Sequence, residues 1–207
     1  LAADQLTGLQ KAMGQSFIDA LFQQPGRRAE IMQALARCPM GLDAGQLHFI
    51  LDSNTKVRTS WQPTFREEEA IASDLEKISH LSIARPRPDG RMGLQDEIYR
   101  IYAERMADTD ALRSYESEMR HQQYGKLVEW AAFVLKDLYQ RREELQLIDQ
   151  QRLAQAVHTP QDALRIKPSS LTTAEQDDVD AVQQSIRDWE LQWLHYQILL
   201  DPEHGFN

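Results

Sequence analysis

A single strand pair, at residues 81–94, interrupts a sequence whose apolar spacing is otherwise helical. Leu81–Arg85 alternates between apolar and polar residues, Pro86–Gly90 contains an Asp-Gly turn signal, and Arg91–Leu94 returns. Three predicted helices, all within residues 27–79, directly precede this hairpin and one follows it. That order is typical of a winged helix, a helix-turn-helix variant with a β wing. The sequence therefore predicts a winged-helix domain over residues 28–108.

The helices around the hairpin are predicted from apolar residues that recur every three or four positions. Asp43 with Gln46, and Thr64 with Glu67, have the spacing of a capping box, which marks two helix starts. Residues 52–65 between them are predicted to form a loop. The helices are expected at residues 4–24, 27–37, 43–51, 65–79 and 96–107.

Beyond Thr109 the helical pattern continues for most of the remaining chain. A broad apolar stripe runs from Leu127 to Tyr139, and a capping signal at Thr172 starts a last helix that reaches Leu200. The expected fold class is mainly α, with a winged helix followed by a helical bundle or the start of a helical solenoid. Aromatic residues at helical spacing are expected in the core of this second part: Trp130, Tyr139, Trp189, Trp193 and Tyr196.

The chain of 207 residues has 23 Lys and Arg against 32 Asp and Glu, a net charge of −9. This charge excludes a global attraction to nucleic acid or to an anionic membrane.

The single cysteine, Cys38, cannot form an internal disulfide and is expected to be a buried residue of a cytoplasmic protein. No apolar run reaches the ~20 residues of a membrane span. A start at Leu1 without Met, and an end directly after an apolar helix, predict a piece of a larger protein.

Sequence motifs of enzyme and metal sites are absent. No Gly-rich phosphate loop is present, so the segment cannot form a P-loop nucleotide site by itself. The six histidines include no pair at the i, i+4 spacing of a helical metal site, and no G-x-S-x-G motif occurs. The many acidic residues are expected on helix surfaces. We therefore expect a non-catalytic segment with no catalytic residue, no metal ligand and no cofactor of its own.

The charges of the predicted winged helix are divided between two surfaces. Residues 66–77, the second helix of the helix-turn-helix, carry two cations against five anions and would be repelled by phosphate. The wing is basic instead, with Arg85, Arg87 and Arg91 within seven positions. Such a wing can contact an anion or a DNA backbone, although three arginines on an exposed turn are more often simply solvated. Nucleic acid is therefore not the partner that we expect.

The wing junction, which we define as Gly93–Tyr99, is where the returning strand enters the next helix. With residues 28–108 around it, it resembles the winged-helix region of the STAND class of signal-transduction NTPases. In that class, related to NB-ARC and NACHT proteins, a Met-His-Asp or Leu-His-Asp-Glu motif lies at this place. The segment Tyr196–Phe206 also resembles one that precedes the helical repeats of some bacterial members.

The resemblance implies that the motif histidine contacts the β-phosphate of ADP, and the matching position here is Gln95, a departure from the family. A glutamine amide can donate a hydrogen bond to phosphate, but it cannot become cationic. Asp96 matches the family aspartate. Asp96 can equally well cap the helix that begins there.

The resemblance also implies a function: a regulatory, non-catalytic segment of a multidomain signalling NTPase. Residues 1–27 would be the end of a preceding helical lid, residues 28–108 the winged helix, and residues 109–207 a helical scaffold. The implied partners are an upstream nucleotide-binding domain that holds ADP or ATP, a downstream helical sensor and, on activation, further copies of the protein. Two alternatives are open, a winged-helix DNA-binding transcription regulator and an oligomerisation module with no nucleotide role.

Overall fold

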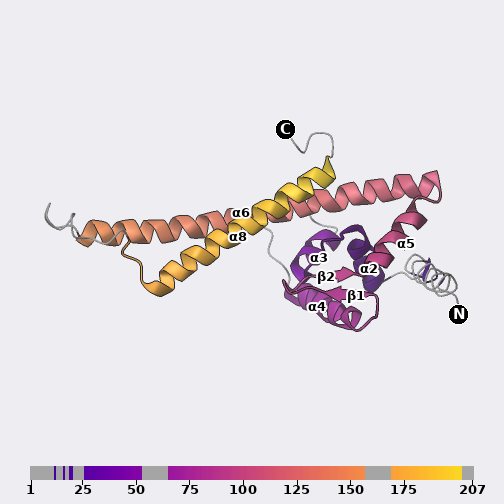
Figure 1. Cartoon of the computed structure of the whole chain (residues 1–207), viewed down its shortest axis with the longest axis horizontal. Coiled ribbons are helices and arrows are strands. Elements are labelled where there is room, and N and C mark those ends of the chain that lie inside the picture. The colour runs from indigo at the N-terminus through magenta and orange to yellow at the C-terminus, as the bar shows by residue number, and fades with distance from the viewer. Residues whose placement is uncertain are drawn as a thin grey trace, which may run out of the picture. The chain divides into compact units, whose positions relative to one another are not determined.

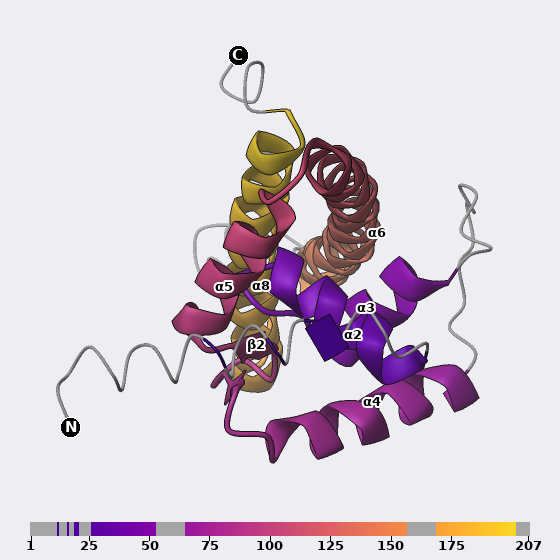
Figure 2. The same cartoon turned by 90° about the vertical axis from the view of Figure 1, so that its right-hand side faces the viewer.

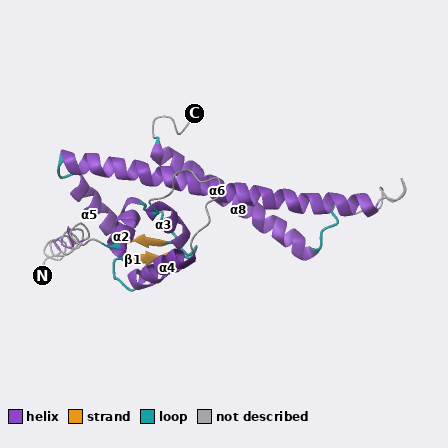
Figure 3. Ribbon diagram, turned by 180° about the vertical axis from the view of Figure 1, so that it is seen from behind, coloured by secondary structure: helices purple, strands orange, loops and turns teal. Residues whose placement is uncertain are grey.

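The computed structural model describes residues 26–52, 65–156 and 169–201, together with Ala12, Ser16, Asp19 and Ala20. Helices make up 79% of these residues, and the described strands form one two-stranded antiparallel sheet (Figures 1 and 3). The expectation of a mainly α fold is therefore confirmed. The chain divides into two compact units, Leu1–Lys126 and Leu127–Asn207.

The boundary between the two units falls within one helix. Helix α6 spans Asp110–Ala156 and contributes its first residues, up to Lys126, to the first unit. This part of α6 belongs there because its polar side chains are bonded to α2 and α3. The divisions expected from the sequence after residues 27 and 108 stay predictions.

The first unit combines short helices with a β-hairpin and the start of α6. Its elements are α2 (Arg27–Arg37), α3 (Ala44–Leu51), α4 (Phe65–Ser79), β1 (Ala84–Pro86), β2 (Met92–Leu94) and α5 (Asp96–Met106). Helix α2 contacts α3, α5 and β2 (Figure 2). Helix α4 contacts α3 and β1. Apolar side chains from these elements and from the segment between α2 and α3 are fully buried and form the core: Ile31, Leu35, Leu42, Leu47, Leu94 and Ile101.

The predicted capping box at Asp43 is confirmed. Asp43 Oδ1 accepts a hydrogen bond from Gln46 N at 2.8 Å, and Gln46 Oε1 accepts one from Asp43 N at 3.1 Å. Each side chain thereby satisfies a backbone N–H that the first turn of α3 leaves without a helical partner. The predicted cap at Thr64 and most of the helix predicted at residues 4–24 lie outside the described residues.

The hairpin forms where it was predicted, but its first strand is shorter. β1 pairs with β2 from Ala84–Leu94 to Pro86–Met92, and Gly90 makes the turn with a φ of +81°. The predicted strand began at Leu81. In the structure, Leu81 N donates to Ile78 O and Ala84 N donates to Leu81 O, so turn bonds that follow α4 occupy this backbone.

A third segment extends the sheet by one residue. Leu42, between α2 and α3, exchanges two backbone hydrogen bonds with Met92 of β2, each 2.9 Å long. The preceding Gly41 has a φ of +77°, which favours glycine. This pairing fastens the α2–α3 turn to the hairpin.

The second unit pairs the later part of α6 with α8 (Thr173–Leu200) in antiparallel directions (Figure 1). Tyr139 OH donates to Glu190 Oε1 at 2.5 Å, and nearer the end of α6 Arg152 binds Glu175 at the start of α8. The predicted cap is confirmed, since the Thr172 side chain accepts from Glu175 N at 3.3 Å. Side chains are buried along both helices: Ala131, Leu135, Leu145, Ile186 and Tyr196.

The aromatic residues of the second unit are not all in its core. Tyr196 is fully buried, as predicted. Trp193 is 36% exposed, so the core prediction is wrong for this residue. Aromatic residues at helical spacing indicate an apolar helix face, but the spacing does not say how many neighbours cover that face.

The single cysteine is buried, as its sequence context predicted. Cys38 is 1% exposed, which confirms that it is buried, and this burial raises the pKa of its thiol to about 11. The thiol is therefore protonated at neutral pH and is a poor nucleophile. Among the described residues, no helix is long and apolar enough to cross a membrane, and no cluster of His, Cys, Asp and Glu could hold a metal ion.

Candidate functional site

A buried carboxylate, Glu116 of α6, lies between α2 and α5 in the first unit. Glu116 is 5% exposed, and its Oε2 accepts hydrogen bonds from Arg37 Nε at 3.0 Å and from Tyr102 OH at 2.7 Å. Its Oε1 accepts a hydrogen bond from Arg120 Nε at 2.8 Å. One carboxylate therefore ties three helices together. It also offsets the charge of the Arg37 guanidinium, which is buried with it.

Three further side chains of α6 donate to backbone carbonyls at the ends of α2 and α3. The bonds are Gln123 Nε2 to Ala34 O at 2.9 Å, Tyr124 OH to Arg37 O at 2.7 Å, and Lys126 Nζ to Ile50 O at 2.7 Å and Asp52 O at 3.0 Å. The last carbonyls of a helix have no partner within the helix and carry partial negative charge. The three α6 side chains supply the missing hydrogen-bond donors for these carbonyls. We call Glu116, Gln123, Tyr124 and Lys126 the clamp.

The clamp was not found from the sequence. Glu116, Arg120 and Gln123 recur at helical spacing, but they are polar, so a search for an apolar stripe passes over them. The expectation that the acidic residues lie on helix surfaces is wrong for Glu116. The sequence did contain a signal for the clamp. Within three turns, one face of α6 carries a carboxylate, an amine, an amide and a hydroxyl group, a combination that can bind neighbouring helices.

Hydrogen bonds within the first unit hold the wing junction in place. Leu94 N donates to Tyr99 OH at 2.8 Å, and Gln95 N donates to Ile83 O at 2.9 Å. The side-chain amide of Gln95 donates to Ser82 O at 2.5 Å. The amide that the family resemblance assigns to a phosphate is therefore engaged with the backbone in this arrangement.

Asp96 is not the cap of α5, so that expectation is wrong. The N-cap residue is Gln95, which makes no side-chain capping bond, and Asp96 is the first residue of the helix. The Asp96 side chain is 90% exposed, and its Oδ1 lies 3.5 Å from Arg85 Nη1. A carboxylate in this position is favoured by the positive end of the helix dipole.

An open pocket of about 400 Å³ lies at the wing junction. Its lining residues are Arg85, Gln95, Asp96 and Glu97. The structure thus brings Gln95 and Asp96 together with one of the three wing arginines. The lining carries one cation and two carboxylates, and this negative balance disfavours a phosphate group.

The wing arginines make contacts within the first unit and do not form one basic surface. Arg85 faces Asp96, and its side chain is 60% exposed. Arg87 Nη2 donates to Pro39 O at 2.6 Å. Arg91 is buried, with its Nε 3.6 Å from Asp89 Oδ2. An anion would therefore meet Arg85 more readily than the other two arginines.

Helix α4 presents an acidic surface. Its exposed acidic residues are Glu67, Glu69 and Glu76. Asp74 is buried and accepts hydrogen bonds from Arg27 Nε at 2.7 Å and Arg28 Nε at 3.0 Å. Burial raises the pKa of Asp74, but the hydrogen bonds and charges of the two arginines outweigh it and leave the pKa below its ordinary value. This surface would repel the phosphates of nucleic acid.

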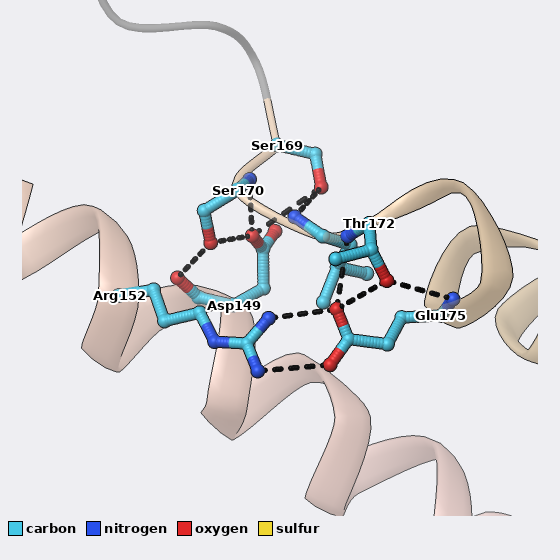
Figure 4. Close-up of polar contacts among 7 residues, drawn as sticks. Asp149, Arg152, Ser169, Ser170, Thr172 and Glu175 are labelled. Atoms are coloured by element: carbon cyan, nitrogen blue, oxygen red, sulfur yellow. Dashed lines mark hydrogen bonds and ion pairs between the residues drawn. The ribbon is translucent and has the colours of Figure 1, made fainter.

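In the second unit, a polar cluster joins the end of α6 to the segment that leads into α8 (Figure 4). Asp149 Oδ1 accepts hydrogen bonds from Ser170 N and Ser170 Oγ, both at 2.6 Å, and from Ser169 Oγ at 3.3 Å. These bonds hold the pKa of Asp149 below its ordinary value. Arg152 donates through both terminal nitrogens to Glu175, at 2.7 and 2.9 Å. The cluster fixes the register of the two helices.

The stability of this cluster is expected to depend on pH through Glu175. The bonds from Arg152, and then those from Thr172, lower the pKa of Glu175 from 4.5 to about 2. Because the folded pKa is lowered, the stabilisation is complete above pH 4.5 and is lost as the pH falls towards 2. Arg152→Gln should raise the pKa of Glu175, measured by NMR titration of its carboxyl carbon. Arg141→Gln is the control and should leave it unchanged, and an equal shift in both variants would contradict the assignment.

Comparisons of the chain with protein-family models, with curated proteins and with solved structures find no match.

Proposed function

We propose that residues 28–108 form a winged helix that acts as a protein-contacting switch, and that α6 carries its movement to the rest of the chain. The parent would be a STAND-class signal-transduction NTPase, as the wing junction suggests. In this proposal the winged helix packs on an upstream nucleotide-binding domain at rest and leaves it on activation. The change is a shift between two populated arrangements, biased by ADP or ATP.

The winged-helix assignment is supported by the order of the elements. Three helices, a hairpin and a fourth helix follow one another from α2 to α5. The Leu42–Met92 bridge adds a short strand-like segment between the first two helices, which joins the wing to the helix-turn-helix. A winged helix can bind either DNA or a protein, so the fold alone does not identify the partner. The charges on its surface are the evidence that distinguishes the two.

The clamp is the observation that carries the proposal. Helix α6 is bonded to α2 and α5 through buried side chains and to α3 through the half-buried Lys126, and the same helix continues to Ala156. Moving the winged helix without α6 would break the Arg37–Glu116 ion pair and the hydrogen bonds of Gln123 and Tyr124 to α2. A displacement of the winged helix is therefore passed directly to the start of α6.

The surface charges favour a protein partner over nucleic acid. The exposed face of α4, the helix that would enter a DNA groove, is acidic. The arginines of the wing are held by Asp96, Pro39 and Asp89, and the pocket beside the wing is negative. The contact of Gln95 with a phosphate stays a prediction, and it would require the amide to leave Ser82.

Hydrogen–deuterium exchange on the protein in its natural length tests the switch. We expect exchange in β1, β2 and α5 to differ between the ADP-bound and the ATP-analogue-bound protein, because their surface is covered in one state only. Residues 116–126 should stay protected in both states, because the clamp moves with the module. A protein that binds neither nucleotide, or whose exchange is the same with both, would overturn the proposal.

The DNA-binding alternative predicts a different result. A transcription regulator of this fold binds duplex DNA with an affinity that falls steeply with salt. We expect no such binding at about 0.15 M salt, a concentration that screens charges beyond ~8 Å. Salt-sensitive binding that is lost when Arg85, Arg87 and Arg91 are changed to Ala would favour the alternative instead.

A further inference from the structure

The second unit has an apolar groove between α6 and α8, apart from the clamp and the wing. Its volume is about 710 Å³, and its apolar lining comes from Ala132, Leu135, Tyr139 and Trp193. On α8, large apolar side chains remain exposed on either side of Trp193: Leu191 at 67% and Leu194 at 45%. A helix with large apolar side chains on several faces is usually covered by more than one neighbour.

The groove has the dimensions of a helix site. Its lining on α6 runs from Ala132 to Glu143, which corresponds to about 16 Å along the helix, or three turns. Two antiparallel helices leave such a groove along their contact, and in helical bundles a further helix fills it. An amphipathic helix would place its apolar face against the two aromatic rings.

The groove is formed in advance by contacts within the unit. Tyr139 OH donates to Glu190 Oε1, and the Arg142 guanidinium lies 5.0 Å from the centroid of the Tyr139 ring. A guanidinium over an aromatic face is attracted to it. Because the ring is held from two sides, an incoming helix need not order it on binding.

The charges around the groove select the occupant. Its rim carries Glu143 and Glu190 against Lys136. Over the whole second unit, the described residues include five Lys and Arg against twelve Asp and Glu. This surplus attracts a basic segment, and it repels an acidic segment or the same unit of a second copy of the chain.

We propose that the α6–α8 groove binds an amphipathic helix of a partner protein, with aliphatic residues on one face and Lys or Arg on the other. The apolar face covers Trp193 and Tyr139, and the basic residues lie beside Glu143 and Glu190. All the lining residues of the groove lie in the second unit, so its binding can be tested without nucleotide.

The test uses two synthetic helical peptides of about 14 residues, or two heptads. Both have Leu on the apolar face, with Lys elsewhere in one and Glu in the other. Binding to the whole chain is measured by calorimetry and by the NMR shift of the Trp193 indole N–H. We expect the Lys peptide to bind at least tenfold more tightly than the Glu peptide and to shift this resonance. Equal binding of both peptides, or no shift at Trp193, would overturn the proposal.

A matched pair of variants separates the groove from general electrostatics. Ala132→Arg places a bulky cation in the groove, whereas Ala181→Arg makes the same change at an exposed position that does not line it. We expect the first to weaken binding of the Lys peptide at least tenfold and the second less than twofold. Equal losses in the two variants would show that only net charge matters and would overturn the site.

A second pair of variants tests the groove if Ala132→Arg disturbs folding, which circular dichroism would detect. Glu143 lines the groove, and its exposed neighbour Glu144 does not. Glu143→Lys should weaken binding of the Lys peptide several times more than Glu144→Lys. Sedimentation of the chain tests whether a second copy of it fills the groove instead. We expect a monomer. A dimer that Ala132→Arg abolishes would show that the groove binds a second copy of the chain and would overturn the proposal of a basic helix.

Discussion

Glu116→Ala is expected to lower the free energy of unfolding of the protein by about 3–5 kcal/mol. The change leaves the Arg37 guanidinium, 4% exposed, without its counter-charge and removes the acceptor of the Tyr102 hydroxyl. A buried charge that loses its partner keeps its cost of desolvation. Denaturant unfolding, followed by circular dichroism, measures the loss as a lower midpoint with an unchanged slope.

Glu118→Ala is the matched control for this prediction. Glu118 lies on the same helix and is exposed, where it accepts a hydrogen bond from Gln122. Its loss should change stability by no more than about 0.5 kcal/mol. Equal losses for the two substitutions would contradict the role of Glu116 as the centre of the clamp.

A combined variant separates the buried charge from simple loss of packing. Replacing the whole polar group, with Arg37→Met, Glu116→Leu and Tyr102→Phe together, leaves no unpaired buried charge at this place. Well-packed apolar residues often substitute for a buried ion pair without loss of stability. The combined variant should therefore be more stable than Glu116→Ala alone, although it changes three residues. If it were less stable than Glu116→Ala, the loss would come from the specific geometry of these contacts and not from an unpaired buried charge.

The helices and the hairpin were predictable because their signals are local. The capping box at Asp43 and the turn at Gly90 each depend on residues within a few positions, and both occur as expected. The Leu42–Met92 pairing was not predictable, since one residue that bridges to a strand shows no alternation. The start of β1 was missed for a related reason, because turn bonds after α4 take the backbone that the pattern assigned to the strand.

The candidate sites differ in how far the sequence could reveal them. Gln95 and Asp96 are neighbours in the chain, so their place at one pocket needed only the hairpin. The clamp joins Glu116 to Arg37 across 79 positions, and no periodic pattern connects residues so far apart. Trp193 was expected in the core and is exposed, because the spacing of a helix does not show which neighbours cover its apolar face.

Gly41→Ala is expected to destabilise the first unit by more than the strain of its backbone alone. Gly41 has a φ of +77°, where a side chain costs about 1–2 kcal/mol. An added Cβ would also lie 2.8 Å from Met92 O and 3.1 Å from Met92 C, so it would push apart the backbone bonds between Leu42 and Met92. Thermal and denaturant unfolding should show a loss of about 2–4 kcal/mol, the strain plus the broken pairing.

Gly90→Ala isolates the part of this loss that comes from strain. Gly90 has a similar φ of +81°, but no atom lies within 4 Å of an added Cβ. Its substitution should therefore cost only the backbone term, about 1–2 kcal/mol. The difference between the two variants measures how much the unit depends on the close approach of the α2–α3 turn to β2. If the two losses were equal, the Leu42–Met92 pairing would not be what holds the hairpin to the helices.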